Sequence, residues 1–119
     1  MNVLIVEDDM VLSLVHKTIA EMIGLNVLGS AVSGEEAIEK VIKLQPDLIL
    51  MDVMLSDELD GIDAVLQLRK QNINTPVIFI TGNSDAYNKR RAKKTNFLAY
   101  LIKPINLDTL KKSVSKLTA

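Results

Sequence analysis

Apolar and polar positions alternate along the chain in two different rhythms. Five short apolar runs are each typical of a buried strand: 3–6, 27–32, 48–51, 77–80 and 98–102. Between and after these runs, apolar residues recur at steps of three and four, which predicts helices over 11–22, 37–42, 62–66 and 107–117. A further helix is expected over 84–94, where the sequence has no clear apolar stripe.

The faces and boundaries of the helices follow from the same pattern. The residues predicted to form the buried stripe of the first helix are Val11, Leu14, Val15, Thr18 and Met22. Ser33 followed by Glu36 has the pattern of a capping box, which predicts the start of the second helix. Pro46 and Pro76 each stand just before a strand, where a helix cannot continue.

Five strands, each followed by a helix, predict an α/β fold with helices on both faces of a parallel sheet. The second run contains Gly29-Ser30-Ala31 and is the least apolar, which suits an edge strand. With right-handed crossovers, this favours a doubly wound five-stranded sheet of order 2-1-3-4-5, a flavodoxin-like (βα)5 three-layer sandwich. The chain has 119 residues and no linker-like or repeated segment, so residues 1–119 are predicted to form one domain.

Composition excludes several classes of protein. Cysteine is absent, which excludes disulfides and thiolate metal sites. No apolar stretch approaches the ~20 residues that span a bilayer. The apolar run that precedes Glu7-Asp8-Asp9 is too short for a signal peptide. A cytoplasmic protein without a membrane partner is expected.

The net charge of −1 conceals an asymmetry between the two parts of the chain. Residues 1–88 hold 14 acidic and 5 basic residues (−9), and residues 89–119 hold 9 basic and 1 acidic (+8). The basic side chains expected on the last two helices are Lys89, Arg90, Arg91, Lys93, Lys94, Lys111, Lys112 and Lys116. They form either an ordinary solvated face or a surface that attracts an acidic partner. Aromatic residues are 3% of the chain, too few for base stacking, so direct nucleic-acid binding is not expected.

Acidic residues stand where two neighbouring strands are predicted to end. In a sheet of this order, ligands bind beyond the carboxyl ends of strands one and three. Strand one runs into Glu7, Asp8 and Asp9, and strand three runs into Asp52. Close carboxylates repel, and a hard cation such as Mg²⁺ (or Mn²⁺) removes the conflict. A metal is favoured for Asp8 with Asp52, whereas Asp9 is expected only to cap the first helix.

Two other strand ends lead to the same edge of the sheet. Strand four ends in Thr81 and strand five in Lys103. Taken singly, these would be an ordinary hydroxyl and a solvated cation. Beside a metal and a carboxylate they indicate a phosphoryl site, with Asp52 as the nucleophile that forms an acyl phosphate.

These motifs together resemble one known family. The matching stretches are VLIVEDD (3–9), PDLILMDVML (46–55), DGIDAV (60–65), PVIFITG (76–82) and YLIKP (100–104). In this order and spacing, the chain resembles a response regulator receiver domain of two-component signalling, of the CheY-like superfamily, over its whole length.

The resemblance implies a role for each residue of the site. Asp52 becomes the phosphoacceptor, and Thr81 and Lys103 the residues that contact the phosphoryl group. The implied metal ligands are Asp8, Asp52, the backbone carbonyl of Met54 and, through water, Glu7. Tyr100 matches an aromatic switch position, and the Lys103–Pro104 bond is expected to be cis.

The sequence departs from the family pattern near the phosphoacceptor. Leu55 or Ser56 stands where many members have proline, and the loop to Gly61 is one residue longer than the commonest form. Before the last strand, Asn96 is expected to supply a left-handed turn residue. Met54 and Asn83 each lie two positions after a site residue and are expected to tune the lifetime of the phosphate.

The resemblance also implies partners. The phosphodonor would be a phosphohistidine on a sensor histidine kinase or a histidine phosphotransfer protein. Phosphorylation would switch a surface formed by the fourth helix, fifth strand and fifth helix, which would bind an output domain, a protein target or a second copy. No helix-turn-helix follows Ala119, so gene regulation by this chain alone is not expected.

Two other functions are weighed against this one. A haloacid dehalogenase-type phosphatase also uses an aspartyl nucleophile. That family has the motif Asp-x-Asp after its first strand, whereas Asp52 is at the end of the third strand here and residue 54 is methionine. A nucleotide- or flavin-binding domain would need a phosphate loop where EDDM (7–10) stands. The chain is therefore expected to catalyse its own phosphorylation and dephosphorylation without being a conventional enzyme. His16 is not expected to be phosphorylated, because histidine phosphotransfer modules are all-helical and this chain is not. It is expected to lie on the surface or to be half-packed.

Overall fold

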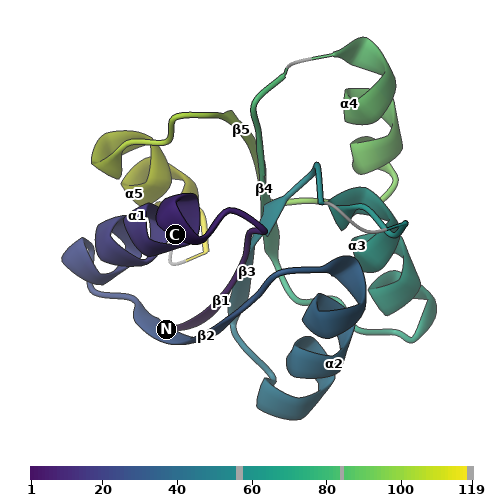
Figure 1. The fold of residues 1–119 in the computed structure, drawn as a ribbon, viewed down its shortest axis with the longest axis horizontal. Coiled ribbons are helices and arrows are strands. Elements are labelled where there is room, and N and C mark those ends of the chain that lie inside the picture. Colours follow the sequence, from purple (N-terminus) through teal and green to yellow (C-terminus); the bar gives the residue numbers. More distant parts are fainter. Residues whose placement is uncertain (56–57, 84, 118–119) are drawn as a thin grey trace.

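The computed structural model describes residues 1–55, 58–83 and 85–117. Strands and helices alternate along the chain: β1 (Asn2–Val6), α1 (Met10–Met22), β2 (Asn26–Ala31), α2 (Gly34–Leu44), β3 (Leu48–Asp52), α3 (Gly61–Lys70), β4 (Val77–Thr81), α4 (Ala86–Lys93), β5 (Ala99–Ile102) and α5 (Leu107–Ser115). All neighbouring strands are parallel, in the order β2-β1-β3-β4-β5 (Figure 1). This confirms the predicted fold class and strand order.

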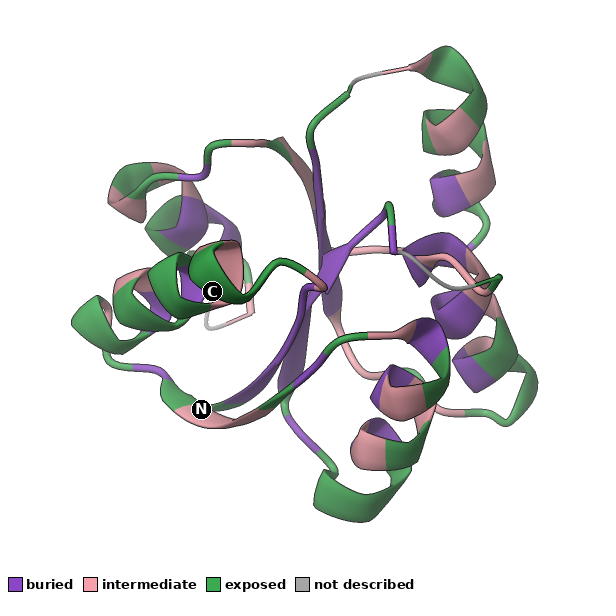
Figure 2. Cartoon of the chain, in the orientation of Figure 1, coloured by how far each residue is buried: buried purple, intermediate pink, exposed green. Residues whose placement is uncertain are grey.

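The helices cover the sheet in two layers. α1 and α5 lie on one face, and α2, α3 and α4 lie on the other (Figure 1). Each face has its own core, one built on Leu4, Ile49 and Phe79 and the other on Ile5, Leu50 and Ile78. β3 and β4 are buried along their whole length, as Figure 2 shows for the centre of the molecule. Their apolar runs are continuous because both faces of a parallel sheet are covered.

Several local predictions are confirmed. The left-handed backbone expected at Asn96 is present, with φ of 56°, and the Lys103–Pro104 bond is cis. The capping box at Ser33 is only half formed. Its hydroxyl accepts from the Glu36 amide, but the Glu36 carboxylate accepts from Val32 instead of Ser33. Ser56 lies outside the described residues.

The predicted buried face of α1 is wrong. All five residues of the predicted stripe are exposed, with Val11 at 72% and Leu14 at 62%. The face that packs on the sheet carries Ala20 and His16 instead, so the prediction of a surface or half-packed histidine is also wrong: His16 is 3% exposed. Apolar side chains occur on both sides of this helix, and the larger ones point outward.

The helices of the described ranges include none that could cross a membrane. The longest, α1, has 13 residues, well short of the ~20 that a bilayer requires.

Candidate functional site

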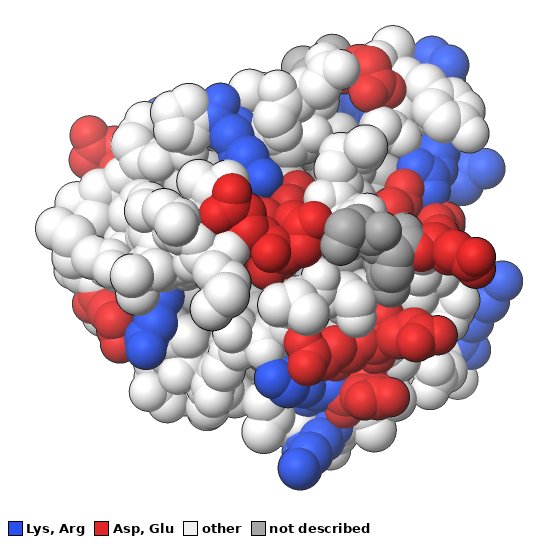
Figure 3. Space-filling model, viewed as in Figure 1, with Lys and Arg blue, Asp and Glu red and all other residues white. Residues whose placement is uncertain are grey.

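Three carboxylates meet where β1 and β3 end. Asp52 is the last residue of β3 and Glu7 follows β1 directly; they are 2% and 1% exposed. Asp8, half-buried, completes the group, and one oxygen of each of the three lies within 4.8 Å of the others. Figure 3 shows acidic side chains gathered near the middle of this face, with a basic side chain beside them. The expected juxtaposition of strands one and three is thus present.

Lys103 bridges the two buried carboxylates. Its Nζ lies 2.9 Å from Glu7 Oε1 and 3.1 Å from Asp52 Oδ2. The side chain reaches this position from the loop after β5, whose start is tied to the end of β4 because the Lys103 amide donates to the Thr81 carbonyl. The expected lysine therefore contacts the acids directly and is not a solvated cation.

Backbone amides hold the carboxylates in place. The Met54 amide donates to Asp52 Oδ1 at 3.2 Å, and the Asp9 amide donates to Glu7 Oε2 at 3.1 Å. Asp9 itself caps α1, since its Oδ1 accepts from the amides of Val11 and Leu12, as predicted. The acidic sequence after β1 thus divides into residues that face the site and one that starts a helix.

Burial and mutual repulsion perturb the ionisation of this group. Burial, followed by the neighbouring Glu7, raises the pKa of Asp52 from 3.8 to about 7, against the effect of Lys103. Burial acts to raise the pKa of Glu7 too, but the contacts with Asp52 and Lys103 outweigh it, and that pKa is lowered. Burial acts to lower the pKa of Lys103, and the two carboxylates raise it more. The lysine therefore stays protonated, and Asp52 holds its proton more tightly than an exposed aspartate.

The donor set suits a hard divalent cation. All three side chains offer carboxylate oxygens, the ligand type that Mg²⁺ prefers. Glu7 Oε1 is buried, and the Lys103 ammonium lies 2.9 Å from it. One ammonium faces three carboxylates here, so a divalent cation would offset the remaining negative charge.

Thr81 ends β4, the strand beside the one that ends in Asp52, and Asn83 follows it in the next loop. The Thr81 side chain is buried; its hydroxyl donates to the Asn83 carbonyl at 3.0 Å and accepts from the Asn83 amide at 3.2 Å. The side chains of Asn83 and Met54 are exposed. Both residues named as candidates for tuning therefore border the site through their backbones and are open to solvent at their side chains.

Tyr100 lies on β5 and packs into the core between the sheet and the layer of α2, α3 and α4. Its ring packs against Phe79 and Phe97, with centroids at 6.2 and 5.7 Å. Its hydroxyl is buried and lies close to the Thr81 side chain. Burial, and then the charge of Asp85, raise the pKa of this hydroxyl. The side chain thus points inward, toward Thr81.

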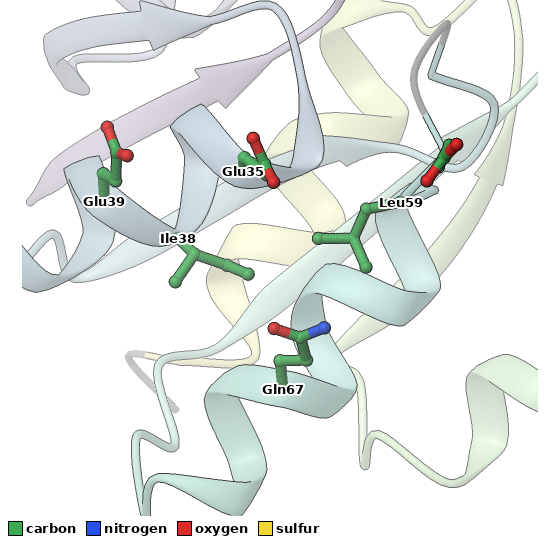
Figure 4. A pocket seen from close by; sticks show the side chains of 6 residues that line it. Glu35, Ile38, Glu39, Leu59 and Gln67 are labelled. Carbon is green, nitrogen blue, oxygen red and sulfur yellow. The ribbon is translucent and has the colours of Figure 1, made fainter.

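A separate hollow lies between α2 and α3. This cavity of about 780 Å³ is lined by Glu35, Ile38, Glu39, Glu58, Leu59 and Gln67, most of which Figure 4 labels. It contains carboxylates and apolar side chains but none of the residues of the acidic group at the ends of β1 and β3. It therefore adds an acidic surface and no further part of that site.

Two features of the site were not found from the sequence. Arg91, predicted as one of the basic surface residues, forms ion pairs with Asp60 and Asp63 at 2.9 Å. Gly61 packs so closely that a Cβ there would lie 2.0 Å from the Asp52 carbonyl oxygen. In the sequence, Asp60 and Gly61 stood out only as part of the family match DGIDAV (60–65), and the apolar pattern carries no signal for either contact.

Comparisons with known proteins agree on one family. A sequence model described as the response regulator receiver domain matches residues 3–115. A probable C4-dicarboxylate response regulator, DctR of Halalkalibacterium halodurans, is 31% identical over 116 residues, which cover 97% of this chain and 50% of that protein. The transcriptional regulatory protein PdtaR of Mycobacterium tuberculosis is 35% identical over 112 residues, covering 92% and 52%. The chain thus spans about half the length of these curated relatives.

Solved structures give the same result. The receiver domain of the Francisella response regulator 1452 has a TM-score of 0.86 and 36% identity, covering 98% of this chain and 94% of that one. The signal receiver domain of a modulated diguanylate cyclase from Desulfovibrio desulfuricans G20 has a TM-score of 0.88 and 39% identity, covering 97% and 90%.

Proposed function

Because the chain belongs to the response regulator receiver domain family of two-component signalling, we propose that Asp52 accepts a phosphoryl group and that this modification switches the surface of α4, β5 and α5. The family is not one of conventional enzymes. One observation carries the proposal: Asp52 is buried at the carboxyl end of β3, within 3.1 Å of Lys103 and beside Glu7 and Asp8. A carboxylate so placed has little structural reason to be there.

The chemistry follows from the residues around Asp52. An Asp52 oxygen attacks the phosphorus of a phosphohistidine, the P–N bond breaks, and the departing imidazole takes a proton from solvent. Lys103 and the Thr81 hydroxyl contact phosphoryl oxygens and offset their charge. Asp52 must be ionised to attack, and Lys103 favours that form.

A divalent cation belongs to this proposal. Asp8 and Asp52 would hold Mg²⁺ (or Mn²⁺) through their carboxylates, Met54 through its backbone carbonyl, and Glu7 through water. The bound cation would neutralise phosphoryl oxygens.

The phosphodonor partner would dock beside α1. The exposed side chains of Met10, Val11, Leu14 and Val15 form an apolar face on the helix that begins next to Glu7 and Asp8. Four large apolar side chains exposed side by side on one helix are typical of an interaction surface. A helical surface that carries phosphohistidine, on a sensor histidine kinase or histidine phosphotransfer protein, would cover this face while its imidazole reaches Asp52.

The output follows from Thr81 and Tyr100. A phosphoryl group draws the Thr81 hydroxyl away from the Asn83 carbonyl, its acceptor here. The Tyr100 hydroxyl is already buried, so the change on phosphorylation would fall on Thr81 and on the position of α4 and would leave this ring inward. The surface of α4, β5 and α5, with Lys89, Lys112 and Lys116 along a hollow of about 380 Å³, would bind an acidic output domain, a protein target or a second copy.

Phosphorylation by acetyl phosphate and Mg²⁺, followed by intact-protein mass, tests the proposal. We expect wild type to gain one phosphoryl group and Asp52→Asn to gain none. Glu39→Gln is the matched control, because it also neutralises one carboxylate, on an exposed position of α2. Equal labelling of Asp52→Asn, or a wild type that no small phosphodonor labels, would contradict it.

A further inference from the structure

α4 is held on the molecule with very little apolar packing. Of its eight residues, only Ala92 is buried. Most surface helices dock through an apolar stripe, which supplies most of their stability in proteins. Something else must therefore fix the position of α4.

Arg91 supplies the missing attachment. One terminal nitrogen of its guanidinium donates to Asp60 Oδ2 and Asn88 Oδ1, both at 2.9 Å. The other donates to Asp60 Oδ1 at 3.2 Å and to Asp63 Oδ1 at 2.9 Å. The Arg91 side chain is 22% exposed, so these contacts are partly shielded from water. We call this group of Arg91, Asp60 and Asp63 the Arg91 clamp.

The clamp ends on the segment that follows the phosphoacceptor. Asp60 caps α3, and Asp60 and Asp63 form the capping box of that helix. The amide of Gly61, the first residue of α3, donates to the Val53 carbonyl at 2.9 Å, next to Asp52. A continuous series of contacts therefore runs from the middle of α4 to the site.

The two ends of α4 are also connected to other parts of the molecule. Its N-cap, Asp85, lies only two residues after Asn83, whose carbonyl accepts the Thr81 hydroxyl. Beyond its last turn, Arg69 Nε of α3 donates to the Thr95 carbonyl at 2.9 Å. If Thr81 leaves Asn83 for a phosphoryl oxygen, the start of α4 is free to follow, while the Arg91 clamp still holds its middle.

We propose that the Arg91 clamp holds α4 in this position and opposes the rearrangement of α4 that phosphorylation of Asp52 drives. This inference rests on the proposed function. If one contact stabilises the arrangement with lower affinity for a phosphoryl group, then its loss must raise that affinity, because the coupling is reciprocal. Activation is then set by two opposed local interactions, the phosphoryl–Thr81 contact and the clamp.

Substitution at Arg91 is the cleanest test, because Asp60 and Asp63 also cap α3. Arg91→Ala removes the clamp. Arg91→Lys keeps the charge but cannot donate to two carboxylates as a planar fork. Arg90→Ala is the matched control: it removes the same charge from the neighbouring residue, which is exposed and has no ion pair among the described residues. Circular dichroism establishes that each variant is folded.

Two measurements on the full chain decide the outcome. Affinity for beryllofluoride with Mg²⁺, a mimic of the aspartyl phosphate, is followed by fluorine NMR. We expect Arg91→Ala to bind it about fivefold more tightly than wild type, Arg91→Lys to lie between them, and Arg90→Ala to match wild type. In hydrogen–deuterium exchange, the α4 amides of Arg91→Ala should exchange about fivefold faster, and those of Arg90→Ala at the wild-type rate.

Unchanged α4 exchange in Arg91→Ala would show that the clamp does not hold the helix. Faster exchange with equal or weaker beryllofluoride affinity would show that it does not oppose activation, and would overturn the inference. A wild type that binds no beryllofluoride would defeat the proposed function, and with it the regulatory role of the clamp. The exchange measurement would still report separately whether the clamp holds α4.

Discussion

At the scale of single residues, Asp52 combines an apolar environment with a group that must ionise to react. It is 2% exposed, and the nearest charges are Glu7, which repels its anion, and Lys103, which stabilises it. One lysine faces two buried carboxylates, so the group carries a net negative charge in a place that disfavours it. Such an arrangement costs stability and is retained where function needs it.

The pH dependence of stability should reveal this cost. The pKa of Asp52 is raised from 3.8 to about 7, so the folded protein binds its proton more tightly than the unfolded chain. Stability from this group is therefore present below pH 4 and is lost as pH rises through about 7. Asp52→Asn lacks the titration, so without metal its unfolding free energy should gain about 4 kcal/mol relative to wild type between pH 4 and pH 8.

Urea unfolding followed by circular dichroism, in buffer with a chelator, measures that difference. Mg²⁺ at pH 8 should reduce it, because the cation stabilises the ionised wild-type site and not the amide. A gap between variant and wild type that stays constant across this pH range would contradict the raised pKa.

The residues at the mouth of the site should control how long the phosphate lasts. The Met54 side chain is 62% exposed, and its amide donates to Asp52 Oδ1. Asn83 is exposed and bonded to the Thr81 hydroxyl. In Met54→Asn with Asn83→Glu, two polar groups can orient a water molecule toward the acyl phosphate. We expect hydrolysis to be about tenfold faster, equivalent to ~1.4 kcal/mol in the barrier.

Loss of phosphate after removal of the phosphodonor gives the rate. Asn74→Glu places the same charge on an exposed loop that leads into the other end of β4 and should hydrolyse like wild type. Equal rates for all three proteins would remove Met54 and Asn83 from the account of phosphate lifetime.

For single residues, the sequence predicted which of them form the site better than it predicted which of them contact one another. Asp8, Asp52 and Lys103 were predictable because each stands at or just after the carboxyl end of a strand, and parallel strands end at one edge. That Lys103 lies between Glu7 and Asp52 depends on side-chain conformation, which strand spacing does not determine. The pairing of Arg91 was missed for the same reason, since a basic run predicts charge and not its partner.

At the scale of elements, the start of α3 packs directly on the end of β3. A Cβ on Gly61 would lie 2.0 Å from the Asp52 carbonyl oxygen and 2.9 Å from Met51 Cγ. The obstacle is the backbone of a central strand, which cannot yield without moving the site. Glycine is required here for close approach, and the capping carboxylate of Asp60 precedes it.

Gly61→Ala should therefore destabilise the protein and disturb the site together. We expect the unfolding free energy to fall by about 2 kcal/mol, as for other overpacked positions, with slower phosphorylation by acetyl phosphate. Gly82→Ala is the control for stability, since a Cβ there would meet nothing within 4 Å. Equal stability of the two variants would show that α3 can shift away from β3 freely.

The helices show where periodicity succeeds and where it fails. α5 has one apolar stripe, and Leu110 on that stripe is buried in the core. α1 has apolar side chains on two faces, so a period of 3.6 cannot choose between them. The face that packs inward contains His16 and Ala20, and the larger apolar groups remain exposed. The proposed docking of a phosphodonor accounts for that exposure, which core packing does not.

At the scale of the whole molecule, charge is distributed unevenly around the sheet. Exposed lysines and Arg90 lie on or next to α4 and α5, whereas Glu35, Glu39 and Glu58 line the hollow between α2 and α3. Two copies can therefore associate in two ways with opposite electrostatics. A symmetric dimer through the α4–β5–α5 surface brings like charges together, and a head-to-tail contact brings the basic surface against the acidic hollow.

The sign of the salt dependence separates these arrangements. With beryllofluoride and Mg²⁺, we expect the protein to form the symmetric dimer, because only a closed two-fold contact buries the same switched surface on both copies. Its repulsion is screened as salt increases, so sedimentation should show dimerisation about tenfold tighter at about 0.5 M than at about 0.05 M salt. Lys89→Glu with Lys93→Glu removes like-charge repulsion and should flatten this dependence. Association that instead weakens as salt is added would indicate the head-to-tail contact, which does not close and would continue into chains.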